Sequence, residues 1–444
     1  MATPYRTTPL PTKDMPPGIP FIVGNEAAER FSFYGMRGIL TVFMMQHLVN
    51  AAGQKDTLSE ADAAVWMHTF VWAVYLTPFL GALLADWVWG KYRTIVALSI
   101  VYCLGHLALA LDVTRAGLAI GLGLIALGAG GIKGCVSAHV GDQFGSANAH
   151  LLPRVYQWFY FSINLGSAAA FLIVPPLLAS HGPHWAFGLP GVVMLLATIV
   201  FWLGRKRYAH IPARGAEFSA EIKNPETWRI LGRLVPLFLC VSMFWALFDQ
   251  TSSRWVAQAG RMDLRFLGWE LNPSQSQVFN PILVMLLIPF TAWVLYPLIN
   301  RFWPLTPLRK IGLGFFVAIP SFLIPAWIEA RIGAGEVPSI AWQLLAYFFI
   351  TLAEVMISIT CLEFAYTQAP KRLKSLVLGL FFLSVSLGNF FTALTNLIGA
   401  EALKGPVYYL FFSGCIAATA VVFAVLAVRY QPKTYLQDGS SAAG

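Results

Sequence analysis

The stretch GNEAAERFSFYGMRGILTVFM, residues 24–44, carries four charged side chains in or beside an apolar run. Glu26, Glu29, Arg30 and Arg37 are acids and bases of the kind that bind ions and exchange protons. Each charge at the centre of a bilayer costs about 2.5–3.5 kcal/mol on insertion scales. Glu26 and Arg30 are four residues apart, which allows an ion pair within one helix. We expect these charges to act together.

A helical projection of this stretch separates two faces. One face is apolar. On the other face, the four charges and two aromatic rings fall within an arc of roughly 140°. The residues of this charged face are Glu26, Glu29, Arg30, Phe33, Tyr34 and Arg37. One interpretation is an ion pair that only holds the helix in place. The other is a functional site, because ionisable residues inside a membrane are functional by default.

Two further charges lie in apolar surroundings. Lys133 follows the glycines of GAGGIKGCVSAHVGDQF, and Glu354 lies in TLAEVMISIT. Lys133 either extends to the nearby surface or meets an acid. Glu354 is too deep to reach either surface easily, so it should take up a proton or seek a cation. We predict that Lys133 and Glu354 are partners and form a gate.

Four polar residues are candidates for the same site. His68 is either a hydrogen-bonded packing residue or a proton-sensitive group, since imidazole titrates near neutral pH. Asp249 is either a solvated helix end or the partner of Arg37 in an outer gate. Asn164 and Asn280 present amides either to a cavity or to a neighbouring helix.

The elements that position these residues are predicted to be membrane helices. The chain is 57% apolar and 11% charged, whereas a soluble domain is about 25% charged. Apolar runs recur at the length of roughly 20 residues that a membrane helix needs, and no alternating barrel pattern is present. We predict an all-α integral membrane protein with twelve spans, at 28–50, 64–85, 93–112, 117–138, 154–177, 186–204, 231–251, 278–299, 309–330, 339–361, 374–397 and 405–428.

The basic segment 205–230 divides these spans into six and six. Short basic turns, GKYRTI and TPLRKIG, follow the second and eighth spans, as expected for the duplicated six-span unit of major-facilitator transporters. We therefore predict no extra inserted helices and the following parts: an N-terminal tail 1–27, a six-helix bundle 28–204, the linker 205–230, a six-helix bundle 231–430 and a C-terminal tail 431–444.

The distribution of Lys and Arg predicts the orientation. If both termini are cytoplasmic, the outer segments hold few basic residues, namely Lys55, Arg115, Arg261, Arg265, Arg331 and Lys404, and the inner segments hold a clear excess. The net charge of +9 then reflects topology and does not indicate nucleic-acid binding. The N-terminus shows no signal-peptide pattern. The five cysteines lie in apolar runs, which predicts free thiols.

Several blocks of the sequence resemble the proton-coupled oligopeptide transporter family, in family order. EAAERFSFYG (26–35) is similar to the family motif ExxERFxYYG. The other blocks are GALLADWVWGKYRTI (81–95), GAGGIKGCVSAHVGDQF (128–144), FYFSINLGS (159–167), FWALFDQ (244–250) and LEFAYTQAPKRLKS (362–375). The resemblance runs from about residue 20 to residue 430. It implies a major-facilitator fold that takes up di- and tripeptides together with protons by alternating access.

The resemblance also implies roles for the candidate residues. Arg30 and Lys133 would bind the peptide carboxylate, and Glu354 would bind the peptide amine. Glu26, Glu29 and Arg30 would couple protons, with His68 and Asp249 as further proton-linked groups. Asn164 and Asn280 would hold the peptide backbone. The remaining substrate-binding residues would line the cavity: Phe33, Tyr34, Arg37, Tyr75, Trp245 and Phe381. No metal or other cofactor is expected, because protons are the coupling ion.

This sequence departs from the family pattern at Phe33, where the motif has Tyr, so one hydroxyl is missing from the expected site. The short loops favour a protein of a bacterial inner membrane, and we expect a monomer. A transporter of nitrate, an amino acid or a peptide-like drug on the same scaffold is the main alternative. A membrane enzyme is disfavoured because no HExxH or similar motif is present, and a receptor because it needs fewer spans.

Overall fold

The structure is a computed structural model that describes residues 5–370 and 373–432. Nearly all of its regular structure is helical, in agreement with the predicted all-α class. Among the described residues, eleven helices are long and apolar enough to cross a membrane. α1 (Ile19–Gln46), with 28 residues and four charges, is a further candidate. The total of twelve spans stays a prediction.

The chain divides into two compact units, Met1–Thr57 with Ala73–Asn224 and Leu58–Trp72 with Pro225–Gly444. The helix α2 (Glu60–Leu84) therefore contributes its first half to the second unit and its remainder to the first. The other helices of the first unit are η1 (Ala85–Trp89), α3 (Lys91–Leu111), α4 (Arg115–Gly141), η2 (Ala149–Leu151), α5 (Leu152–His181), α6 (Pro183–Leu203), η3 (Gly204–Lys206) and α7 (Ala216–Lys223).

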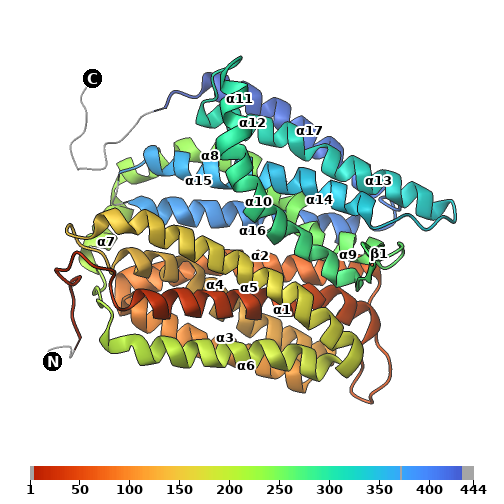
Figure 1. Cartoon of the computed structure of the whole chain (residues 1–444), viewed down its shortest axis with the longest axis horizontal. Helices are drawn as coiled ribbons and strands as arrows, with labels where there is room; N and C mark the ends of the chain where they lie inside the picture. The colour runs from red at the N-terminus through yellow and green to blue at the C-terminus, as the bar shows by residue number, and fades with distance from the viewer. Residues whose placement is uncertain (1–4, 371–372, 433–444) are drawn as a thin grey trace. The chain divides into compact units, whose positions relative to one another are not determined.

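Within the first unit, α1 packs against α5 and α6, and α3 packs against α4 and α6 (Figure 1). α1 begins at Ile19 with a proline in its first turn, well before the predicted start at residue 28. Proline suits that position because its fixed φ matches a helix and its missing N–H is not needed there. The early start places Glu26, Glu29 and Arg30 well inside the helix instead of at its edge.

Glycines bring α2 and α4 into direct backbone contact. A Cβ on Gly81 would collide with the backbone of Gly131, and a Cβ on Gly130 would collide with Thr77. Small residues at such crossings let membrane helices approach closely. The glycine-rich stretch before Lys133 therefore has a packing function.

Replacing Gly81 by Ala should lower the melting temperature of the purified protein in detergent. The added methyl group has no space, and overpacking typically costs about 1–3 kcal/mol. Thermal unfolding followed by tryptophan fluorescence measures the change. Gly123→Ala is the matched control, because a Cβ on this α4 glycine meets nothing within 4 Å. Equal melting temperatures for the two variants would contradict close α2–α4 packing.

The second unit continues from α8 (Pro225–Phe248), which packs against α16 and α17, while α13 packs against α14 and α17. Its other elements are η4 (Asp249–Ser252), α9 (Arg254–Ala259), η5 (Pro273–Val278), α10 (Phe279–Phe290), η6 (Thr291–Leu295), α11 (Tyr296–Asn300), α12 (Pro307–Ala318), α13 (Pro320–Gly333), α14 (Ala341–Glu354), η7 (Val355–Ile359), α15 (Thr360–Thr367), α16 (Lys374–Ile398) and α17 (Pro406–Arg429).

One short hairpin was not predicted. β1 (Arg265–Phe266) pairs antiparallel with β2 (Trp269–Glu270). The two residues between the strands, Leu267 and Gly268, both have positive φ, 50° and 84°. This combination is typical of the tight turns whose twist matches that of paired strands.

Within residues 5–370 and 373–432, three helices contain a wide π-type turn: η1 after α2, η6 after α10 and η7 after α14. Such turns are rare and are frequent at functional sites. η7 begins directly after Glu354. The five cysteines are all free thiols, as predicted.

Candidate functional site

Two carboxylates share one guanidinium on α1. Nε of Arg30 lies 2.7 Å from Oε1 of Glu26 and 2.9 Å from Oε2 of Glu29. All three side chains are buried. The ion pair predicted from the four-residue spacing of Glu26 and Arg30 is thus confirmed. Removal of Arg30 would leave two buried carboxylates without this partner, which is strongly unfavourable, whereas removal of one carboxylate leaves Arg30 paired with the other.

Lys133 on α4 adds a second buried cation to this unit. Its Nζ lies 4.0 Å from the centre of the Phe33 ring and 5.6 Å from that of Tyr75. Within the described part of the chain, Nζ has no hydrogen-bond partner. Lys133 is only 8% exposed, so the alternative that it extends to the surface is wrong. An aromatic face stabilises a desolvated cation by about 2 kcal/mol.

The charges in this part of the first unit nearly cancel. Lys133 interacts electrostatically with Glu26 and Glu29 as well as with Arg30. These two carboxylates and two cations sum to zero when all four are ionised, and Arg37, which also interacts with Lys133, adds one positive charge. A proton that entered together with a further anion would leave the total charge of this buried cluster unchanged.

Phe33 provides an apolar face where the family motif has a phenol. Its ring is fully buried and meets the ring of Tyr34 edge-on, with the ring centres 5.4 Å apart. Tyr34 in turn meets Phe171 at 5.8 Å. These contacts hold the ring beneath Lys133. Phe33 is therefore positioned to stabilise a cation and not to donate a hydrogen bond.

The remaining candidates of the first unit are Asn164 and Arg37. Nδ2 of Asn164 donates to the backbone carbonyl of Tyr160 in its own helix, at 2.9 Å. Arg37 is buried, with 4% exposure, two turns beyond Arg30 on α1. Its predicted pairing with Asp249 would join the two units and stays a prediction, as does the predicted gate of Lys133 and Glu354.

In the second unit, Glu354 accepts a hydrogen bond from Asn280, which also contacts Thr351. Nδ2 of Asn280 donates to Oε2 of Glu354 at 2.8 Å and to Oγ1 of Thr351 at 3.1 Å. Asn280 lies in the first turn of α10, and Glu354 is the last residue of α14. No salt bridge to Glu354 is present among the described residues of this unit. Its carboxylate has one amide donor there and keeps capacity for a cationic ligand.

A chain of hydrogen bonds connects Asp249 to His68. Nδ2 of Asn389 donates to Oδ2 of Asp249 at 2.6 Å, and Oδ1 of Asn389 lies 2.8 Å from Nδ1 of His68. Because the amide oxygen can only accept, Nδ1 of His68 must carry the proton. Nε2, 2.8 Å from Oγ of Ser253, is then the atom that can gain or lose a proton.

The arrangement favours neither of the two interpretations of His68 outright. The ring is fully buried and hydrogen-bonded at both nitrogens, as expected of a packing residue. It is also linked through Asn389 to a buried carboxylate, and a proton on Nε2 would be retained by the serine oxygen. Asp249 is 2% exposed, so the interpretation as a solvated helix end is wrong.

Trp245 and Phe381 form an aromatic wall in the second unit. Their ring centres lie 6.0 Å apart with the rings perpendicular, and Phe248 meets Trp245 at 5.4 Å. Nε1 of Trp245 is buried, and no described residue accepts its hydrogen bond. The role of Trp245 and Phe381 in a substrate pocket stays a prediction.

Three polar residues of these networks were missed from the sequence: Asn389, Ser253 and Thr351. Each is a small polar residue in or beside an apolar run, and Asn389 in LSVSLGNFF was the detectable one. A buried amide in a membrane helix needs partners, so its presence indicates a hydrogen-bond network. Which partners it has depends on helices distant in the sequence.

The fold and the buried charges define a multi-pass helical membrane protein. Comparison with known proteins places it in a class. A model of the POT family matches residues 92–224 and 215–405. The peptide transporter family 1 protein of Drosophila melanogaster is 36% identical over 363 residues, which cover 71% of this chain and 48% of the relative. Human solute carrier family 15 member 2 is 36% identical over 377 residues, 73% of this chain and 51% of the relative.

Solved structures agree. A crystal structure of an auto-inhibited POT family peptide transporter has a TM-score of 0.86 and 35% identity and covers 96% of this chain and 99% of its own. The structure of the POT family transporter PepTSo has a TM-score of 0.85 and 36% identity, covering 94% and 99%. The chain belongs to the POT family, which is a family of transporters and not of enzymes. It spans about half the length of the curated relatives that it matches.

Proposed function

We propose that this protein carries di- and tripeptides into the cell together with protons, by alternating access. The observation that carries the proposal is the buried cluster in which Glu26 and Glu29 share Arg30. The peptide transporters similar to this chain support the substrate class. The proposal extends to the bacterial inner membrane, to cytoplasmic termini and to a monomeric protein.

A peptide is a zwitterion, and both of its charged ends must lose water when they enter a buried site. This step is costly unless each end meets an opposite charge. Arg30 and Lys133 receive the carboxylate, and Glu354, with Asn280 beside it, receives the amine. Tyr34, Tyr75, Trp245 and Phe381 tolerate varied side chains because apolar walls make few directional demands.

A proton taken up by Glu26 or Glu29 offsets the negative charge of the peptide carboxylate that enters the first unit. In the empty state, Glu26 and Glu29 hold Arg30 within α1. When one of them is protonated, Arg30 is released for the incoming carboxylate, and the total charge of the cluster is unchanged. Loss of the proton to the cytoplasm restores the internal ion pair and expels the peptide. Protons are the coupling ion, and His68 and Asp249 form a second group that can change its protonation.

The membrane potential supplies enough energy for this cycle. One charge that crosses about 100 mV gains about 2.3 kcal/mol. With 1.36 kcal/mol for each factor of ten, this energy supports an accumulation of roughly fifty-fold.

Uptake of labelled dialanine by proteoliposomes that contain the purified protein tests the proposal. We expect accumulation above the external concentration only with an inward proton gradient, and none after an ionophore collapses the gradient. Liposomes without protein are the control. Excess unlabelled dialanine should abolish uptake and nitrate should not, since a site with a cation and a carboxylate favours a zwitterion. Competition by nitrate but not by dialanine would support the alternative solute.

A further inference from the structure

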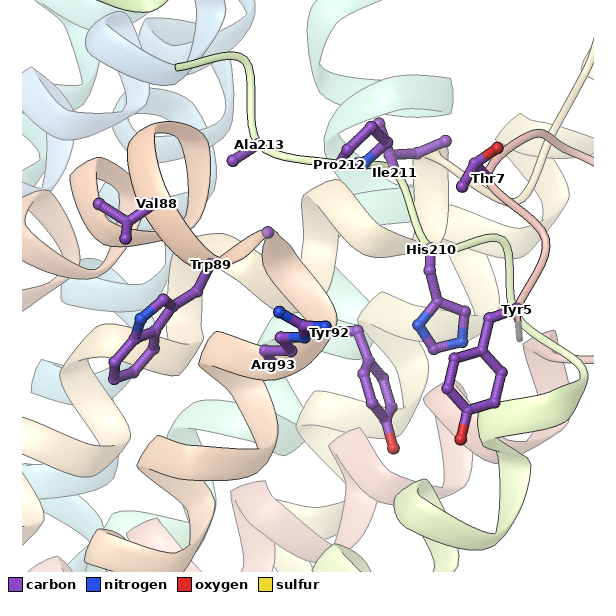
Figure 2. A pocket seen from close by; sticks show the side chains of 11 residues that line it. Tyr5, Thr7, Val88, Trp89, Tyr92, Arg93, His210, Ile211, Pro212 and Ala213 are labelled. Carbon is purple, nitrogen blue, oxygen red and sulfur yellow. The ribbon is translucent and has the colours of Figure 1, made fainter. Parts of the chain in front are cut away.

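A separate cavity lies at the beginning of α3 in the first unit (Figure 2). Its volume is about 260 Å³, below the roughly 300–1,000 Å³ of a typical small-molecule pocket, so it suits a headgroup-sized ligand. The residues that line it include Tyr5, Trp89, Tyr92, Arg93, His210 and Ala213. None of them belongs to the site described above.

The cavity is built by three segments that meet around His210. The ring of His210 stacks on Tyr5 at 4.4 Å and meets Tyr92 edge-on, also at 4.4 Å. The backbone N–H of His210 donates to the carbonyl of Arg6 at 2.7 Å, which ties the N-terminal segment to the linker. Gly90, with φ of 76°, separates η1 from α3 and so allows Arg93 to lie in the first turn of α3.

The cavity has a positive charge without an acidic partner. Arg93 is exposed and makes no hydrogen bond or ion pair with the described residues, and the lining contains no Asp or Glu. Acids near this end of the unit are engaged elsewhere, Asp142 with Lys91 at 2.7 Å and Asp86 with Arg214 at 3.4 Å. Arg93 therefore remains available to an anion.

His210 does not add a second charge at neutral pH. Burial lowers its pKa below the ordinary value, and the nearby Arg6 and Arg93 lower it further, although the hydrogen bond of Nε2 to the carbonyl of Arg205 opposes them. The ring is therefore a neutral wall of the cavity. With Tyr5 and Tyr92 it provides aromatic faces to the cavity.

The rim of the cavity is suited to the surface of a bilayer. Trp87, Val88 and Trp89 are 51%, 61% and 44% exposed at the end of η1. Exposed side chains also run along α3 beyond Arg93, including Ile100 and Leu104. Trp side chains gather at the headgroup level of membranes, and acyl chains cover the apolar faces beneath. A phosphate bound at Arg93 would thus have apolar protein surface beside it.

We infer that this cavity binds the phosphate headgroup of an anionic glycerophospholipid, with Arg93 as the phosphate-binding residue. Such a lipid fits both features of this surface. Its phosphate would pair with Arg93, and its acyl chains would cover the exposed tryptophans and the exposed side of α3. Basic pockets at the cytoplasmic ends of membrane helices bind lipid headgroups in this way.

The test uses the full-length protein in mixed micelles and measures bound phosphatidylglycerol by native mass spectrometry. Arg93→Gln should weaken binding about fivefold, since one Arg near the surface contributes about 1 kcal/mol, and Arg93→Lys should retain most of it. Arg154→Gln is the matched control, because Arg154 is also exposed and lies over an exposed tryptophan, Trp158, outside the cavity. The control should bind within twofold of the unchanged protein.

Two results would overturn the inference. If Arg93→Gln and Arg154→Gln lose lipid equally, the attraction is a general effect of surface charge. If inorganic phosphate displaces the lipid at concentrations where chloride does not, and phosphatidylglycerol binds no better than phosphatidylcholine, the cavity binds a free anion. Selective loss in Arg93→Gln, with preference for phosphatidylglycerol, supports the lipid site.

Discussion

Glu354→Gln should reduce uptake of dialanine about 10- to 100-fold at a peptide concentration well below saturation. Glutamine keeps the shape of the side chain and can still contact Asn280, which lies 2.8 Å from the carboxylate, but it removes the negative charge. A hydrogen bond to a charged group contributes about 1.5–3 kcal/mol, and each 1.4 kcal/mol is a factor of ten in affinity. The measurement is initial uptake into proteoliposomes at a fixed proton gradient.

Glu363→Gln is the control for this variant, because Glu363 is exposed on α15, beyond the wide turn that follows Glu354. It should leave uptake unchanged. A peptide whose amine is acetylated should be a poor substrate of the unchanged protein. Its uptake should differ little between the unchanged protein and Glu354→Gln. If Glu354→Gln transports dialanine at the normal rate, Glu354 does not bind the amine.

Glu26→Gln and Glu29→Gln should each abolish accumulation driven by a proton gradient while some exchange of peptide across the membrane continues. In these variants the cluster permanently lacks one of the two carboxylates within 3 Å of Arg30. Arg30 then stays available to the peptide, and no proton has to be taken up. Gradient-driven uptake and counterflow, measured on the same proteoliposomes, separate coupling from binding.

Glu270→Gln, in an exposed position of β2, controls for the loss of a carboxylate in general and should keep both activities. Circular dichroism and size-exclusion profiles should be unchanged in all three variants. If both Glu26→Gln and Glu29→Gln still accumulate peptide in response to the gradient, α1 is not the coupling element. If counterflow is lost as well, the carboxylates are required for binding, and the proposed exchange of partners at Arg30 is wrong.

The sequence predicted best what local periodicity determines. The pairing of Glu26 with Arg30 follows from the helical repeat, because residues four apart lie on one face. The half-buried position of Glu354 within its span follows from the apolar residues on both sides of it. The long apolar runs indicated the membrane helices themselves, since length and hydropathy are sufficient for that purpose.

Features that depend on distant segments or on small energy differences were not predictable in the same way. α1 begins at Ile19, with a proline in its first turn, inside the segment that was predicted to be an N-terminal tail. Asn280 precedes its partner Glu354 by 74 residues, and no local pattern connects them. Asn389 joins His68 to Asp249 across even larger separations. Roles that join the two units remain predictions.

The wide turn η7 has a mechanical consequence for peptide transport. A helix resists bending because its backbone hydrogen bonds repeat regularly, and a π-type turn interrupts that repeat. In this span the interruption begins at Val355, immediately after the carboxylate proposed to hold the peptide amine. The irregular turn of this span therefore lies next to Glu354, the residue proposed to bind the peptide. If a bound peptide draws Glu354 towards it, the helix would bend at η7. Peptide binding would then tilt the following segment, Thr360–Thr367, without distorting α14.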